Sequence, residues 1–349
     1  MKKIKKRAKN EKALIKLLII IFIILMAIYV FNIKNKENSE NSNNIGNVVK
    51  NEKIDNIAPE ITLNEEKTII TIGEKYIPKA TAKDDVDGDI TSRIQTSELD
   101  TSKAGEYEIN IFVSDNAGNK TEKKQKVIIR EELKNGLPVL MYHFFYDNNK
   151  YFKADNNWLN INDFEEQLKY MNENNFYFPT WNEVNDYIDG KIKLPSKSVI
   201  LTVDDGDASF FDLAVPLLQK YKIPATSFVI TSWYGHRYDS AMQYVVWESH
   251  SNNMHEAGAN GKGRMVNWNY EQVVEDVKES SKILGGANVF CYPFGHYNDT
   301  AIKALKDTGY ILAFTVEGGR VNKNTNKYKL PRVRVTEGNS LNYFIKSIN

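Results

Sequence analysis

The chain has 349 residues, of which 42% are hydrophobic and 26% charged, enough length and apolar content for two globular domains with further segments. Its formal net charge of +1 excludes a strong overall attraction to nucleic acid. Its single cysteine, Cys291, excludes an intramolecular disulfide, so the domains must be stabilised by their hydrophobic cores.

The N-terminal segment predicts a membrane anchor. Residues 1–16 are dense in lysine and arginine, and the stretch from Leu17 to Phe31 holds no charged residue. This run of about 15 residues approaches the roughly 20 that span a bilayer when Ala13 to Ile15 are added and Lys16 extends to the headgroups. A cleaved signal peptide is the alternative, but no small-x-small cleavage site follows the run. Residues 1–32 are therefore expected to be a basic cytoplasmic segment and an uncleaved, single-pass anchor in the cell membrane, with everything after it extracellular.

The anchor is followed by a polar segment. Residues 33–57 are rich in asparagine and lysine and almost free of aromatic residues. This composition is typical of a flexible, solvated linker, which lets the following domains reach away from the membrane.

Residues 58–131 predict a small antiparallel β-sandwich. Apolar and polar residues alternate in "EITL", "KTIITI", "YEINIFVSD" and "KKQKVIIRE", and glycine and aspartate clusters separate these runs. With "APEITL", "AKDDVDGDIT" and "KAGEYEINIFVSDNAGN" at the expected places, the stretch resembles the bacterial immunoglobulin-like (Ig-like) domains of surface proteins. No catalytic group stands out, so we expect a spacer or wall-contacting module.

One loop of this sandwich is a candidate calcium site. Its aspartates are Asp84, Asp85, Asp87 and Asp89, and Ca²⁺ favours clustered oxygen ligands. The alternative is a hydrophilic turn in which the carboxylates accept hydrogen bonds from the backbone.

From residue 134 to residue 349 the pattern changes to strands alternating with helices. Strands are predicted in "PVLMYHF", "SVILTV", "ATSFVIT", "NVFCYPF" and "ILAFTV", and amphipathic helices in "NINDFEEQLKYMNENN", "FDLAVPLLQKYK", "NYEQVVEDVKESSKILGG" and "DTAIKALKDTGY". Repeated β-then-α order indicates a parallel α/β domain, in which chemistry gathers at the carboxyl ends of the strands.

The strand "VILTV" ends in two adjacent aspartates and a glycine. Neighbouring side chains on extended backbone point in opposite directions, so Asp204 and Asp205 can contact different groups. One carboxylate can bind a cation while the other faces a water molecule bound to that cation. Gly206 permits a tight turn directly afterwards. A simple polar turn is the alternative.

A second stretch, "VVWESHSNNMHEAG", places two of the five histidines after another apolar strand. His250 and His255 are five residues apart, a spacing that would separate them on a regular helix or strand, so only an irregular loop can bring them together. Two histidines and one aspartate form a three-ligand set for a catalytic zinc ion with an open position for water. The alternative is a pair of solvated surface histidines.

A third stretch, "NVFCYPFGHYND", ends a strand with aromatic residues around a proline and a glycine. Tyr292, Pro293 and Phe294 would suit a wall on which a sugar ring stacks, whereas Phe290 is better explained by core packing.

In order and spacing, "LTVDDG", "SHSNNMH" and "CYPFG" resemble the first three motifs of the polysaccharide deacetylase family (NodB homology, carbohydrate esterase family 4). The resemblance covers about residues 136–336 and implies a distorted (β/α) barrel with an open groove for a polysaccharide. It implies hydrolysis of N-acetyl groups with the help of one divalent metal ion. Zn²⁺ is the expected ion, and Co²⁺ and Ni²⁺ are the alternatives.

The resemblance also implies roles for individual residues. Asp204 matches the catalytic base, and Asp205, His250 and His255 match the metal ligands. The backbone N–H of Phe294 would hold the oxyanion, and Ser251 would brace the histidine loop by a hydrogen bond.

This chain departs from the family pattern at two places. Many members keep an arginine in the third motif, where this chain has Cys291; Arg332 of "LPRVRV" is the candidate replacement. No late histidine follows His296 to act as general acid, which leaves His143 and His296 as candidates. His236 is expected to be a bystander. The five-residue histidine spacing and "YPFG" resemble the branch with poly-N-acetylglucosamine deacetylases and related Gram-positive cell-envelope enzymes.

The predicted function is a membrane-anchored, extracellular, metal-dependent hydrolase that removes N-acetyl groups from N-acetylglucosamine residues of cell-wall peptidoglycan. Deacetylation of an exported poly-N-acetylglucosamine and O-acetyl esterase activity are alternatives within the enzymes. A non-catalytic wall-binding protein is the alternative from another class.

Overall fold

The structure, a computed structural model, describes residues 55–349. The predicted basic segment, the anchor from Leu17 to Phe31 and nearly all of the predicted linker lie outside the described residues. Within residues 55–349, none of the helices combines the length and the apolar character needed to cross a bilayer.

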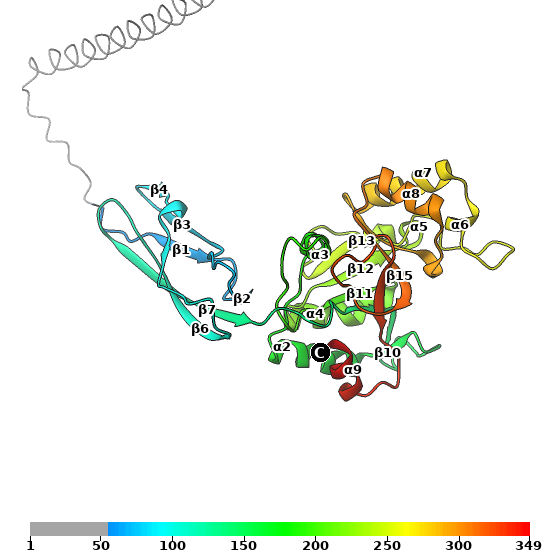
Figure 1. Ribbon diagram of the computed structural model, residues 1–349, viewed down its shortest axis with the longest axis horizontal. Coiled ribbons are helices and arrows are strands. Elements are labelled where there is room, and N and C mark those ends of the chain that lie inside the picture. The colour runs from blue at the N-terminus through cyan, green and yellow to red at the C-terminus, as the bar shows by residue number, and fades with distance from the viewer. Residues whose placement is uncertain (1–54) are drawn as a thin grey trace, which may run out of the picture. The chain divides into compact units, whose positions relative to one another are not determined.

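The first described domain is a β-sandwich, drawn in blue to cyan in Figure 1. Its strands are β1 (Glu60–Leu63), β2 (Lys67–Thr71), β3 (Ala80–Asp84), β4 (Gly88–Asp89), β5 (Gln95–Thr96), β6 (Gly105–Ser114) and β7 (Lys120–Arg130). One sheet has the order β1-β3-β4 and the other β2-β7-β6-β5. Alternate residues of β6, including Ile109, Ile111 and Val113, are buried, as expected for a strand with one face on the core.

The prediction of a purely antiparallel sandwich is wrong at one pair of strands. β2 pairs with β7 in parallel, in a register that sets Ile69 beside Ile128. β2 lies beside β7 in one sheet, whereas its neighbours in sequence, β1 and β3, pair with each other in the other sheet. Alternation of apolar residues predicts the buried face of a strand but not the direction of its partner.

The aspartates of the predicted calcium loop mainly stabilise turns. Asp84 Oδ1 accepts hydrogen bonds from the N–H groups of Val86 and Asp87, and Asp89 accepts one from Thr91. Asp87 forms an ion pair with Arg93, with 2.9 Å between Asp87 Oδ2 and Arg93 Nη1. One member of the quartet, Asp84, belongs to a group of three carboxylates with Asp55 and Asp115, whose ligand oxygen atoms lie within 4.8 Å of one another. The backbone hydrogen bonds match the turn alternative, and a calcium site, here with Asp84 and two aspartates from outside the predicted loop, stays a prediction.

The second domain is a closed barrel of seven parallel strands in the order β11-β12-β13-β14-β15-β16-β8. These strands are β8 (Val139–Tyr142), β11 (Ile200–Val203), β12 (Ala225–Val229), β13 (Val245–Ser249), β14 (Val289–Cys291), β15 (Leu312–Gly318) and β16 (Leu330–Arg334). Two short strands, β9 (Phe144–Tyr146) and β10 (Trp158–Asn160), pair outside the barrel. The predicted (β/α) barrel is confirmed.

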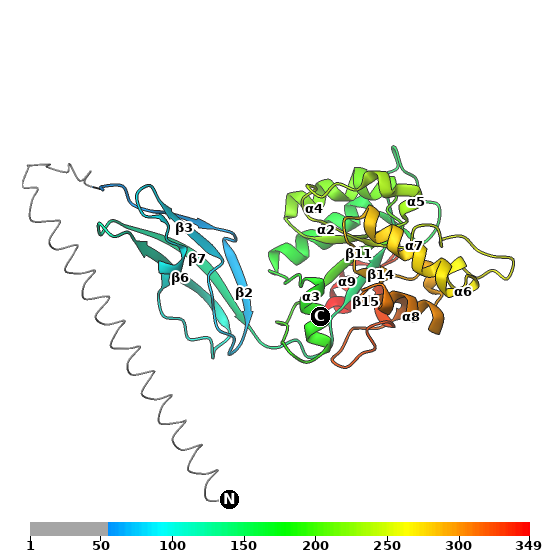
Figure 2. The same ribbon diagram turned by 90° about the horizontal axis from the view of Figure 1, so that it is seen from above.

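Helices surround the barrel (Figures 1 and 2). They are α2 (Ile161–Glu173), α3 (Trp181–Ile188), α4 (Val215–Tyr221), α5 (Thr231–Tyr234), α6 (Arg264–Asn267), α7 (Tyr270–Ile283), α8 (Asp299–Asp307) and α9 (Leu341–Ile348). The side chain of Asn160 caps α2, and Asn269 forms a capping box with Gln272 at the start of α7, which is why these helices begin where the sequence predicts.

The helix predicted over "FDLAVPLLQKYK" is regular only in its second half. A wider π-helical turn, Phe210–Ala214, precedes α4. Pro216 has no N–H to donate, so it fits only in the first turn of α4.

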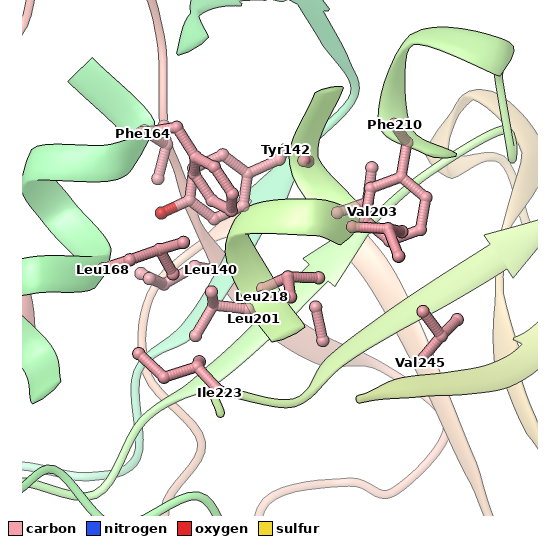
Figure 3. Packing of buried hydrophobic residues seen from close by; sticks show 14 of the residues in the cluster. Leu140, Tyr142, Phe164, Leu168, Leu201, Val203, Phe210, Leu218, Ile223 and Val245 are labelled. Atoms are coloured by element: carbon pink, nitrogen blue, oxygen red, sulfur yellow. The ribbon is translucent and has the colours of Figure 1, made fainter. Parts of the chain in front are cut away.

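The largest core cluster lies between the barrel and its helices (Figure 3). Phe164 and Leu168 of α2 and Leu218 of α4 pack against Leu140 and Leu201 of the barrel strands. Each of these side chains is fully buried, and burial of such a side chain contributes about 1.5–3 kcal/mol. This packing fixes strands β8 and β11 and, with them, the residues that follow the strand ends.

Candidate active site

The residues singled out in the sequence come from different strands but lie at one end of the barrel. Asp204 and Asp205 follow β11, His250 follows β13 and His143 follows β8, whereas Arg332 lies within β16. Because all the barrel strands are parallel, their carboxyl ends share one rim, where loops can combine side chains distant in sequence.

Asp205, His250 and His255 form a group of three ligand side chains whose nitrogen and oxygen atoms lie within 4.8 Å of one another. The Nε2 atoms of the two histidines are each 3.5 Å from Asp205 Oδ1. One carboxylate and two imidazoles are a donor set that suits a divalent ion such as Zn²⁺. The loop after β13 thus brings together the two histidines that a regular helix or strand would separate.

The hydrogen bonding of His250 suits a metal ligand. Its Nδ1 lies 2.8 Å from the backbone carbonyl of Cys291, and since a carbonyl only accepts, Nδ1 carries the proton. The lone pair of the neutral ring is then on Nε2, the atom that faces Asp205. Burial lowers the pKa of His250 to about 3, so the ring is neutral at physiological pH.

Asp205 is held in an unfavourable electrostatic environment. Burial, followed by the charges of Asp204 and Asp207, raises its pKa to about 7. Its backbone has φ +74°, and Gly206 follows at +79°, where a Cβ would lie 3.1 Å from the side chain of Val229. A tight left-handed turn therefore directs the second aspartate to the rim, where a cation would offset the repulsion between the carboxylates.

Asp204 is buried beneath the rim and paired with an arginine. The guanidinium of Arg332 donates from Nη1 to Asp204 Oδ1 and from Nη2 to Oδ2, both at 2.7 Å. Burial alone would raise the pKa of Asp204, but the charge and hydrogen bonds of Arg332 outweigh it and hold the pKa well below its usual value. Arg332 also donates to Thr202 Oγ1 and to the Thr315 carbonyl, so its position is fixed from several strands.

Cys291 lies where many family members have an arginine. Its sulfur is 3.1 Å from Arg332 Nη2 and 3.5 Å from Asp204 Oδ2. Burial raises the pKa of the thiol, which is therefore neutral. The small cysteine leaves room for Arg332 to approach Asp204 from β16.

The predicted aromatic wall is wrong for two of its three residues. Tyr292 is fully buried, packs on Phe290 and donates its hydroxyl hydrogen to the Tyr328 carbonyl. Pro293 is also buried. Both continue the direction of β14 into the core, so neither presents a face to a sugar.

Phe294 is different, because a left-handed backbone (φ +58°) turns it outward. The residue is 41% exposed, and its ring lies next to the His255 ring at 4.2 Å between centroids. The hydrogen bonds of this turn run from the N–H of Gly295 to the Tyr292 carbonyl and from that of His296 to the Pro293 carbonyl. Neither bond uses the Phe294 N–H.

Ser251 braces the histidine loop, in the geometry expected for it. Its hydroxyl accepts a hydrogen bond from the Met254 N–H at 3.1 Å, and its carbonyl accepts one from the Thr231 N–H at 3.0 Å. The residue is fully buried, with φ +73°.

The remaining histidines occupy distinct places. His143 Nε2 lies 3.8 Å from Asp204 Oδ2. His296 accepts a hydrogen bond from the Gly263 N–H through Nδ1 at 3.2 Å, beside the Phe294 ring. His236 is exposed in a short turn after α5. Of the two candidate acids, only His143 contacts the Asp204 carboxylate.

Trp233 is an aromatic residue of this site that the sequence reasoning missed. The residue is 46% exposed, and its ring meets the His255 ring edge-on at 5.7 Å between centroids. The signal was available, because "TSWY" begins two residues after the end of β12, at the rim where the other site residues lie. The exposed aromatic rings next to His255 are thus Trp233 and Phe294, not Tyr292.

The fold and this rim define a (β/α)-barrel hydrolase. Residues 191–313 match the family described as polysaccharide deacetylase, and residues 61–129 match the bacterial surface protein Ig-like domain. The chain thus carries a polysaccharide deacetylase domain of carbohydrate esterase family 4 together with a bacterial Ig-like domain, and the predicted class of enzyme is confirmed.

Relatives and solved structures agree with this class. The poly-beta-1,6-N-acetyl-D-glucosamine N-deacetylase of Staphylococcus aureus (strain MRSA252) is 29% identical over 213 residues, which cover 56% of this chain and 72% of that protein. The structure of IcaB from Ammonifex degensii is similar with a TM-score of 0.51 and 27% identity, over 62% of this chain and 98% of that one. The Streptococcus pyogenes deacetylase PplD in complex with acetate has a TM-score of 0.53 and 24% identity, over 61% and 98% of the two chains, and shows the shared fold.

Proposed function

We propose that the protein is a metal-dependent N-deacetylase of an exported polymer of N-acetylglucosamine. The observation that carries this proposal is the convergence of Asp205, His250 and His255 beside the Arg332-paired Asp204 at the barrel rim. A pure binding module has no need of a buried, ionised carboxylate next to a set of three metal ligands. The arrangement therefore favours hydrolysis over the wall-binding alternative.

Asp205, His250 and His255 would hold the ion, and their donor atoms fit Zn²⁺, Co²⁺ or Ni²⁺. When bound, such an ion lowers the pKa of a water molecule and polarises the acetyl carbonyl.

In the proposed reaction Asp204 accepts the proton of the attacking water, because Arg332 keeps its carboxylate ionised. The water oxygen forms a bond to the acetyl carbon, and the N–H of Phe294 donates to the developing oxyanion. His143 Nε2, 3.8 Å from Asp204 Oδ2, takes up this proton from Asp204 and delivers it to the nitrogen as the C–N bond breaks. The products are acetate and a free amine on the sugar.

The relatives support the choice of substrate. The sequence alone favoured peptidoglycan, but the matched staphylococcal protein is a deacetylase of poly-β-1,6-N-acetyl-D-glucosamine. The exposed rings of Trp233 and Phe294 beside His255 offer apolar faces for the pyranose rings of such a polymer.

The test is to incubate the purified full chain with Zn²⁺ and either poly-β-1,6-N-acetylglucosamine or N-acetylated peptidoglycan, and to measure free amines and acetate. Asp204→Asn is the matched inactive variant. Amines released from the β-1,6 polymer support the proposal. Amines released only from peptidoglycan would show that peptidoglycan, not the β-1,6 polymer, is the substrate. Acetate released without amines would indicate an esterase. No product at all, with Zn²⁺ still bound, would favour the wall-binding alternative.

We also propose that Leu17 to Phe31 anchors the protein in the cell membrane with the barrel outside, on the strength of the uncharged run after a basic segment. Fractionation of cells, followed by protease treatment of intact cells stripped of their wall, tests this. The full chain should be in the membrane fraction and its barrel should be degraded by external protease; a soluble or protected protein would contradict the proposal.

A further inference from the structure

A buried carboxylate on helix α7 holds the loop that carries both histidines. Asp276 is 6% exposed, and its two oxygens accept hydrogen bonds from the N–H groups of Asn252 and Asn253, each 2.7 Å long. These two residues lie between His250 and His255 in sequence. The carboxylate is thus bonded to the middle of the loop that must bring the two imidazoles together.

The loop has no regular secondary structure, so side chains must fix its conformation. Besides the two bonds to Asp276, the Met254 N–H donates to Ser251 Oγ. Three consecutive backbone N–H groups, those of residues 252, 253 and 254, therefore donate to side-chain oxygens rather than to the backbone. On the opposite side, Arg264 donates to the Asn253 carbonyl at 3.0 Å.

Helix α7 contacts this loop and the strand before it at two points one helical turn apart. Ser280, four residues after Asp276, forms a hydrogen bond of 2.7 Å with Ser249, whose hydroxyl accepts the Ser251 N–H. Residues at i and i+4 share one helix face, so α7 bonds both to the end of β13 and to the loop beyond it. The sequence held this signal, because Asp276 and Ser280 stand on the apolar face with Val273 and Val277.

Burying a carboxylate is costly unless its hydrogen bonds compensate, and no direct ion pair of Asp276 exists among residues 55–349. Arg264 lies near enough to act through its charge, but its own ion pair is with Glu256. A neutral side chain on this face of α7 would avoid the cost but would leave two buried N–H groups unpaired. The buried carboxylate thus lowers the stability of the fold but holds the loop in one conformation.

We propose that Asp276 is a positioning residue for metal binding, whose two hydrogen bonds set loop 250–255 so that His250 and His255 face Asp205. This inference rests on the metal-dependent function proposed above. Residues that orient metal ligands from outside the first coordination sphere typically change metal affinity by about 10- to 100-fold when replaced.

The test uses the full chain, freed of metal, and its variant Asp276→Asn, which keeps the shape but presents an NH₂ group to one of the two donors. The matched control is Glu275→Gln, which removes the same charge from an exposed neighbour on α7. Zn²⁺ dissociation constants are measured by competition with a chromophoric chelator, and amide hydrogen exchange is followed at residues 252–254. Asp276→Asn should raise the dissociation constant about 10- to 100-fold and speed exchange at residues 252 and 253. Glu275→Gln should stay within about twofold of the wild type.

An Asp276→Asn variant with the wild-type dissociation constant and exchange rates overturns the inference. If that variant does not fold, Asp276→Glu, which keeps both acceptor oxygens but moves them by one methylene, decides in the same assays: a raised constant supports the inference and an unchanged one overturns it. A wild-type chain that binds none of Zn²⁺, Co²⁺ and Ni²⁺ overturns the proposed function and this inference with it. Wild-type binding with unchanged variants overturns only the inference.

Discussion

The guanidinium of Arg332 forms two parallel hydrogen bonds of 2.7 Å with the carboxylate of Asp204, a residue 128 positions earlier in the chain. Both side chains are almost completely buried. The pair joins β16 to the end of β11, the two strands on either side of β8 in the closed barrel. One interaction therefore contributes both to the closure of the barrel and to the charge state of the proposed base. Its removal should therefore affect both stability and activity.

Replacing Arg332 should destabilise the protein strongly. Arg332→Met leaves the Asp204 carboxylate buried without its partner, and breaking a buried pair from one side typically costs about 3–5 kcal/mol in the free energy of unfolding. Urea denaturation of the metal-free chain measures this. Arg334→Met, two residues along the same strand but exposed, should change the free energy of unfolding by less than about 0.5 kcal/mol. Equal effects of the two variants would show that the Asp204 pairing contributes no special stability.

Removal of the metal should abolish deacetylation without unfolding the barrel. Asp205, His250 and His255 all belong to loops at the rim, whereas the cores under α2 and α4 do not depend on them. Chelator-treated protein should lose activity and regain it with Zn²⁺ or Co²⁺, while its far-ultraviolet circular dichroism stays unchanged. His255→Ala should bind Zn²⁺ more weakly by at least about tenfold. Full activity after exhaustive chelation would contradict the metal-dependent mechanism.

Trp233 should contribute to polymer binding rather than to chemistry. A stacking contact of an aromatic ring is worth about 0.5–1.5 kcal/mol, so Trp233→Ala should raise KM for an oligomer of N-acetylglucosamine about 3- to 10-fold and leave kcat nearly unchanged. The control is Tyr343→Ala, which removes another exposed aromatic ring, on α9. If both variants keep the wild-type KM, Trp233 does not contact the sugar chain.

The buried charge of Asp276 should appear in the pH dependence of stability. Burial, partly opposed by its two hydrogen bonds and by Arg264, raises the pKa of Asp276 from 3.8 to about 6. Between these values the folded chain binds a proton that the unfolded chain has released, so stability falls as the pH rises through this window. The contribution is at most about 3 kcal/mol.

The measurement is urea unfolding of the metal-free wild type and of Asp276→Asn at pH 4, 5, 6 and 7. The variant has no carboxylate at this position, so the wild type should lose free energy of unfolding relative to it between pH 4 and pH 7. A constant difference over this range would contradict a raised pKa at Asp276.

Much of the architecture was predictable because its signals are local. Alternation of apolar residues and the repeated β-then-α order are properties of short windows, and they predicted a parallel α/β domain with most of its strands and longer helices. The closed barrel was implied by the family resemblance. Shorter elements such as α3 and α9 were not predicted, since eight residues hold too few turns for a clear helical period.

The candidate site was predictable to the extent that its residues follow strand ends. Asp204, Asp205 and His250 each come directly after a barrel strand, and parallel strands must bring such residues to a common rim. Tyr292 also follows a strand end, but its side chain is buried in the core and does not reach the rim. The left-handed turn at Phe294 directs the next aromatic ring outward. The pattern of residue types did not predict this left-handed turn.

By itself, the sequence determined which residues follow the ends of the strands and which chemical groups they carry. Strand periodicity and residue type are both properties of neighbouring positions in the chain. Only the tertiary structure decided that Arg332 pairs with Asp204, that Asp276 holds the histidine loop and that Trp233 lies beside His255. These contacts join segments far apart in the chain, and their geometry depends on how the barrel closes and how its helices pack, which no local window contains.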